Sequence, residues 1–102
     1  MERPYKIVDT ASGLVILDGL EAVAWKVLMK ASVPATGVLI KHIAPGQLYT
    51  FIFQQDDEGG HRFAWPATVH NPGTINRKPD AVSVQNYIGS TGGVLYANLP
   101  GT

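Results

Sequence analysis

The residues of this 102-residue chain best suited to chemistry form one short acidic segment that ends in a histidine. Such a cluster could bind a divalent cation or act as an acid/base pair. Calcium loops, however, alternate their ligands over about twelve residues, and neighbouring side chains of an extended segment point to opposite sides. We therefore interpret the segment as a hairpin turn, in which an aspartate starts the turn and two glycines supply positive φ. The segment comprises Asp56, Asp57, Glu58, Gly59, Gly60 and His61.

The other candidate ligands and nucleophiles lack the spacing that metal binding or catalysis needs. The histidines show no H-x₃₋₅-H pattern, and the serines have no nucleophile-elbow context. No glycine-rich run opens a helix to cradle phosphate, and the chain has no cysteine. We expect no catalytic residue, no metal and no cofactor, and a protein that is not an enzyme. The residues considered are His42, His61, His70, Ser12, Ser32, Ser83 and Ser90.

Aromatic residues near the C-terminus form a second group of candidates. Tyr87 and Tyr96 lie near the ends of predicted strands in a polar part of the chain, so we expect them to be exposed. Tyr87 with Asn86 and Gln85 could stack on and hydrogen-bond a sugar. A subunit interface would use the same residues equally well.

The elements that position these residues are predicted to be short strands. Turn signals separate apolar runs rich in Val, Ile, Tyr, Phe and Trp, which is typical of an all-β sandwich or barrel. Eleven glycines and seven prolines fit many turns better than long helices. The predicted strands are Leu14–Leu17, Ala22–Lys30, Gly37–Ile43, Leu48–Gln55, His61–Trp65, Val82–Ile88 and Val94–Ala97.

The strand predicted over Leu48–Gln55 is apolar on both faces, which favours a central position covered on each side. His61–Trp65 is expected to be its hairpin partner, ended by Pro66 because proline has no amide hydrogen. The residues expected in the core are Val23, Trp25, Val27, Tyr49, Phe51, Phe53, Phe63 and Trp65.

Residues 18–31 allow two interpretations. Asp18 to Glu21 resembles a helix capping box, and apolar residues follow at helical spacing. The same residues also alternate as in a strand, and Lys26 and Lys30 share one face in either case. Periodicity alone leaves helix and strand open, and the resemblance described below favours the strand.

The composition limits which partners and locations the chain can have. Eight basic and eight acidic residues cancel, so no field favours nucleic acid or an anionic membrane. No apolar run approaches the roughly 20 residues of a membrane helix, and MERPYKIVD lacks the features of a signal peptide. Charged residues make up only 16% of the chain and hydrophobic residues 45%, which indicates a surface partly buried against other copies. We expect an N-terminal arm or linker over residues 1–12 and one domain over residues 13–102.

The chain resembles a module of bacteriophage tail fibres, tail spikes and head fibres, over roughly residues 14–98. The resemblance lies in Trp25, the stretch PGQLYT that begins at Pro45, the QQD run, GGHR, the Trp65-Pro66 pair and the ending Ile88…Leu95-Tyr96-Ala97. It implies a small antiparallel β-sandwich or jelly-roll-like domain that assembles as a homotrimer.

Three functions follow from these observations. The first is a non-enzymatic structural module, a fibre, tip or decoration protein of a phage or prophage-derived particle, made in the bacterial cytoplasm. It would contact itself, other virion proteins and host surface glycans. The alternative is a carbohydrate-binding module for receptor recognition. A small metal-dependent enzyme using Asp56, Asp57 or His61 is the third.

Overall fold

The computed structural model describes residues 5–70 and 72–97. β-structure takes up 46% of them, and they contain no α-helix, so the prediction of a mostly β protein is confirmed. Two short 3₁₀ turns, Ala35–Gly37 and Thr91–Gly93, join strands.

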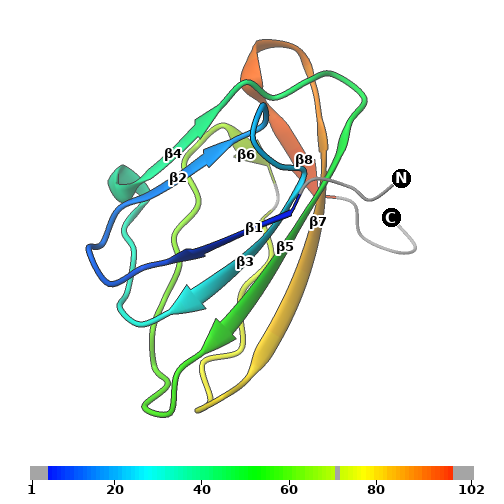
Figure 1. The fold of residues 1–102 in the computed structure, drawn as a ribbon. Helices are drawn as coiled ribbons and strands as arrows, with labels where there is room; N and C mark the ends of the chain where they lie inside the picture. Colours follow the sequence, from blue (N-terminus) through cyan, green and yellow to red (C-terminus); the bar gives the residue numbers. More distant parts are fainter. Residues whose placement is uncertain (1–4, 71, 98–102) are drawn as a thin grey trace.

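Two sheets build the fold (Figure 1). The larger has six strands in the order β1-β3-β5-β7-β8-β6, and the smaller pairs β2 with β4. The large-sheet strands are β1 (Tyr5–Asp9), β3 (Ala24–Met29), β5 (Leu48–Gln55), β6 (Val69–His70), β7 (Val82–Gly89) and β8 (Leu95–Ala97). The small-sheet strands are β2 (Val15–Asp18) and β4 (Val38–Lys41).

The chain winds back and forth between the two sheets, as Figure 1 shows. It passes from β1 to β2, then β3, β4 and β5, so strands of one sheet that follow each other run parallel. Antiparallel pairing is found for β5 with β7 and for β7 with β8. The arrangement is solenoid-like and corrects the predicted antiparallel sandwich or jelly roll. The reason is that each early connection crosses to the other sheet, whereas an antiparallel pair needs a connection that turns back.

The predicted hairpin between β5 and residues 61–65 is wrong. β5 pairs with β3 and β7, and the 61–65 segment contributes one bridge, from Phe63 to Val33. The buried Gln55 side chain donates to the His61 carbonyl at 2.8 Å and accepts from the His61 amide at 3.3 Å. This side chain replaces the backbone ladder that a hairpin would have, and the chain leaves the sheet there.

The ambiguous segment after Asp18 folds as a turn followed by strand β3. The Asp18 carboxylate accepts from the Leu20 amide at 2.9 Å, as in a helix cap, but no helix follows. β3 is hydrogen-bonded to β1 and β5 and alternates between half-buried and fully buried residues. Tertiary pairing on both sides therefore overrides the helical propensity.

Part of the expected N-terminal arm belongs to the sheet. Tyr5–Asp9 forms the edge strand β1, paired in parallel with β3. The buried Thr10 hydroxyl holds this strand end by donating to the Ala31 carbonyl at 2.9 Å and accepting from the Lys30 amide at 2.8 Å. Residues 1–4 of the arm and residues 98–102 of the expected domain lie outside the described residues.

The core lies between the two sheets and is built around aromatic side chains. Phe51 of β5 contacts Trp25 and Trp65, with ring centroids 5.0 Å apart in each pair, and Tyr87 at 5.7 Å. Of the predicted core residues, Val23, Phe63 and Trp65 are partly buried and pack against it. The fully buried ones, Trp25, Val27, Tyr49, Phe51 and Phe53, are confirmed.

Replacing Phe51 tests this central role. We expect Phe51→Ala to lower the free energy of unfolding by about 3–5 kcal/mol, the usual cost of deleting a buried aromatic side chain. The measurement is urea unfolding at one fixed protein concentration. Leu20→Ala is the control, since Leu20 is 76% exposed and surface changes stay within about 0.5 kcal/mol. Equal effects of the two substitutions would contradict the assignment.

Candidate functional site

Three of the predicted contact residues lie on β7, and their side chains point to both of its faces. Tyr87 is 1% exposed, and its hydroxyl donates to Gln85 Oε1 at 2.6 Å. Burial raises the pKa of Tyr87 to about 12. Gln85 is buried beside it and also accepts from Trp65 Nε1 at 3.1 Å. The expectation that Tyr87 is exposed is therefore wrong, because the core satisfies its polar end and removes it from any ligand.

Asn86 and Tyr96 lie on the opposite side of the sheet. Asn86 is half-buried and accepts from the Thr50 hydroxyl at 2.8 Å. Tyr96 of β8 is 47% exposed, and its ring stacks on that of His70, with centroids 4.9 Å apart and an interplanar angle of 16°. The four predicted residues thus do not form one site, and Tyr96 alone offers an exposed aromatic ring.

The outward side of the large sheet is the largest candidate surface. We call it the outer face and define it as the outward-pointing side chains of β1, β3, β5, β7 and β8. The register aligns them in rows, of which one runs through Ile7, Lys26, Ile52 and Val84. Its exposed apolar members are Tyr5, Ile7, Val82, Val84, Ile88 and Tyr96. An apolar surface of this kind is typical of a protein–protein contact.

Charge is sparse on the outer face. Asp9 lies at the β1 edge, and Lys26 lies in β3 between two isoleucines of the central row. Across β7 and β8 the outward residues carry no charge. The β7–β8 half is therefore the part that can be buried without a desolvated charge.

The apolar character of both β5 faces was predicted from the sequence, whereas this exposed surface was not, since the sequence pattern predicted a cover on each side. The same pattern placed β5 centrally. The central position is confirmed by pairing with β3 and β7, while Ile52 and Leu48 remain half-exposed on the outer face. Other described residues cover the inward side of β5, whereas its side on the outer face is left partly exposed.

A smaller apolar strip lies on the outward side of the two-stranded sheet. Ile16 of β2 and Leu39 of β4 are register partners, and both are exposed. Leu14 precedes them and is also exposed. The strip has too few exposed apolar side chains to compare with the outer face as a contact surface.

The acidic segment forms a capped turn. One Asp56 carboxylate oxygen accepts from the Glu58 and Gly59 amides at 3.1 and 3.0 Å, and His61 Nε2 lies 3.1 Å from it. Gly59 and Gly60 have positive φ, as predicted. Candidate ligand atoms of Asp56, Glu58 and His61 lie within 4.8 Å of one another, whereas Asp57 does not join them. Turn capping accounts for this convergence, so we propose no metal site.

The other two histidines make separate contacts. His42 Nδ1 lies 2.9 Å from the Asp18 carboxylate, at the end of β4. His70 stacks on Tyr96. No two of the three histidines share a site within the described residues.

The sequence analysis missed a cavity on the inward side of the large sheet. Its lining includes Arg62 and Arg77. Fifteen positions separate these arginines in the sequence, and no known motif links them, so the local pattern held no signal for their approach.

Comparison of the chain with models of known families, with curated proteins and with solved structures finds no match. No helix in the described part of the chain has the length and apolar character needed to cross a membrane.

The Asp56 cap predicts a pH-dependent contribution to stability. Burial opposes ionisation of this carboxyl group, but hydrogen bonds from Gly59 and His61 outweigh it and lower the pKa of Asp56. A lowered pKa in the folded state stabilises the protein above the unfolded value, and this stability is lost as the pH falls through the folded value.

We therefore expect Asp56→Asn to reduce the urea midpoint at neutral pH. The reduction should shrink at a pH about two units below the ordinary aspartate value of roughly 3.9. Asp57→Asn is the matched control, since Asp57 is exposed and lies outside the cluster. A pH-independent loss, or an equal loss in the control, would argue against the cap.

Proposed function

We propose that this chain is a non-enzymatic structural module that assembles as a homotrimer through its outer face. The observation that carries the proposal is the reversed polarity of β7. This strand buries Gln85 and Tyr87, and it exposes Val82, Val84 and Ile88. Strands at a solvated surface normally have the opposite pattern, apolar inward and polar outward. An apolar side turned outward is explained by a partner that covers it.

A second copy is the partner that this surface fits best. Fully burying a valine or isoleucine side chain contributes roughly 1.5–3 kcal/mol, and half-exposed side chains contribute about half of that. Six such side chains contribute roughly 4.5–9 kcal/mol, which is comparable with an association cost of about 4–15 kcal/mol. A chain with only 16% charged residues also has few groups to desolvate.

The ring that we propose uses two different parts of the outer face. A three-fold assembly closes through heterologous contacts, in which one surface of a copy meets another surface of the next. The uncharged β7–β8 half would pack against the β1–β3 half of the neighbour, with the Ile52 side chains of β5 nearest the axis. Lys26 could then keep its ammonium group in water while its aliphatic stem covers apolar surface.

The role in a phage or prophage-derived particle, as a fibre, tip or decoration protein, is supported by the sequence resemblance. Residues of that resemblance occupy structural positions: Trp25 is in the core, Gly59 and Gly60 are in the turn, and Trp65 contacts Phe51. The homotrimer, the location in a virion and contacts with other virion proteins are parts of this proposal.

The oligomeric state tests the proposal. Light scattering on a size-exclusion column should give a mass near three times 11.0 kDa over a wide concentration range. We expect Val84→Lys to shift this mass to 11.0 kDa, because an ammonium group would be buried in the contact without a partner. Circular dichroism should show an unchanged strand content.

Leu39→Lys provides the matched control. Leu39 is a strand residue of comparable exposure, but it lies on the outward side of the small sheet. The control should remain trimeric. A wild-type monomer at every concentration, or dissociation by Leu39→Lys and not by Val84→Lys, would refute the proposed contact.

Carbohydrate binding is the second candidate, and the exposed Tyr96 ring favours it. With Tyr87 buried, Tyr96 stacked on His70 is the remaining aromatic platform among the predicted contact residues. The expected result is binding to host surface sugars on a glycan array that Tyr96→Ala abolishes. Retained binding in this variant would remove Tyr96 as the site.

A further inference from the structure

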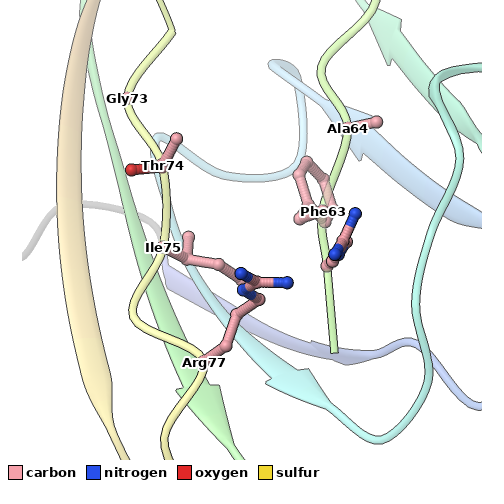
Figure 2. A pocket seen from close by; sticks show the side chains of 7 residues that line it. Phe63, Ala64, Gly73, Thr74, Ile75 and Arg77 are labelled. Atoms are coloured by element: carbon pink, nitrogen blue, oxygen red, sulfur yellow. The ribbon is translucent and has the colours of Figure 1, made fainter. Parts of the chain in front are cut away.

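A cavity of about 480 Å³ lies between two extended segments that face the inward side of the large sheet. Ligand pockets commonly measure about 300–1,000 Å³. One wall is formed by residues 62–64 and the other by residues 73–77, as Figure 2 shows. The lining residues are Arg62, Phe63, Ala64, Gly73, Thr74, Ile75 and Arg77.

Both walls are fixed by hydrogen bonds at positions away from the cavity. On the first wall, the Arg62 amide donates to the Ser32 hydroxyl at 2.9 Å, and the Ala64 amide donates to the Val33 carbonyl at 3.0 Å. On the second wall, the Asn76 amide donates to the Ser83 hydroxyl at 2.8 Å. The walls approach each other where the Gly60 amide donates to the Arg77 carbonyl at 2.7 Å. These hydrogen bonds anchor the backbone of both walls, and the Arg62 and Arg77 side chains are exposed.

Two guanidinium groups give the cavity its charge. Figure 2 shows Arg77 extending from its wall into the space between the two segments, and Arg62 lines the same space from the other wall. Neither arginine forms an ion pair with an acidic residue within the described part of the chain. Guanidinium groups match the geometry of carboxylate and phosphate oxygens and hold them through paired hydrogen bonds.

The remaining lining is mostly apolar, and a buried amide group lies behind it. The rings of Phe63 and Phe53 have centroids 4.9 Å apart, so Phe63 is held against the core at the cavity wall. Ile75 lies across from it in Figure 2. Behind Gly73, the buried Gln85 Nε2 has no hydrogen-bond partner. A ligand that fits has one anionic group and a compact body with an apolar side.

We propose that this cavity binds a sugar-sized organic anion, whose carboxylate or phosphate group pairs with Arg62 and Arg77. The site is independent of the homotrimer, because the cavity lies on the inward side of the large sheet and the outer face on its other side. A failure of the trimer leaves this proposal standing, and a failure of this proposal leaves the trimer standing.

Three probes with the same ring test the proposal on the full chain. We expect glucuronate or glucose 1-phosphate to bind saturably and glucose not to bind. Titration is followed by ¹⁵N–¹H spectra, in which the amides of residues 62–64 and 73–77 should shift. Inorganic phosphate alone should bind more weakly than the better sugar anion. The preferred sugar anion tells whether the cavity selects carboxylate or phosphate.

Charge-removing variants locate the site. Arg62→Gln and Arg77→Gln should each weaken binding by about tenfold or more, since each removes charge-assisted hydrogen bonds to the anion. Lys78→Gln is the control, because it removes a positive charge next to Arg77 but outside the lining. Equal binding of glucose, equal losses in all three variants, or shifts confined to other residues would overturn the proposal.

Discussion

The fold depends on one layer of aromatic rings on the inward side of the large sheet. Trp25, Phe51 and Phe53 come from neighbouring strands, and Phe51 also contacts Tyr87 from β7 and Trp65 from the loop that follows β5. Because strand side chains alternate with a period of two, fixing these rings inward also fixes their sequence neighbours outward. On β5, Ile52 lies between two of the rings, and on β7, Ile88 is next to Tyr87, with Val84 and Val82 exposed on the same side. The same packing that forms the core therefore creates the apolar outer face.

The sequence predicted the parts of the fold that depend on local pattern. The bounds of β5 match the prediction at both ends, and five of the predicted core residues are fully buried. For β3 the local pattern left helix and strand open, and only the resemblance favoured the strand that the structure has. The pairing of strands was not predictable in this way. Parallel pairs join segments that are distant in sequence. The local sequence pattern does not determine whether the next strand belongs to the same sheet or to the other one. The hairpin failed for a related reason, since the Gln55 side chain binds His61 in place of a backbone ladder.

For Tyr87 the strand was predicted correctly, but the exposure of the side chain was not. The prediction of β7 was accurate to one residue, yet the polar residues of its alternation were assumed to face water. They face the core, where Tyr87 and Trp65 both donate a hydrogen bond to Gln85 Oε1. A register shifted by one residue would exchange the two faces. Inward polar residues have a cost unless they are paired. The Tyr87 hydroxyl and Gln85 Oε1 are paired, whereas Gln85 Nε2 has no partner among the described residues, and the apolar residues of β7 remain on the outside.

β7 also connects the assembly surface to the cavity. Its outward residues Val82 and Val84 belong to the outer face, and Ser83 between them accepts a hydrogen bond from Asn76 of the cavity wall. Tyr87 accepts from Gly73 in the same wall at 3.4 Å. These two hydrogen bonds attach the second cavity wall to the inward side of β7. Because successive side chains of a strand point to opposite faces, β7 supports the cavity wall with its inward residues and the assembly surface with its outward residues, so a partner on the outer face leaves the cavity uncovered.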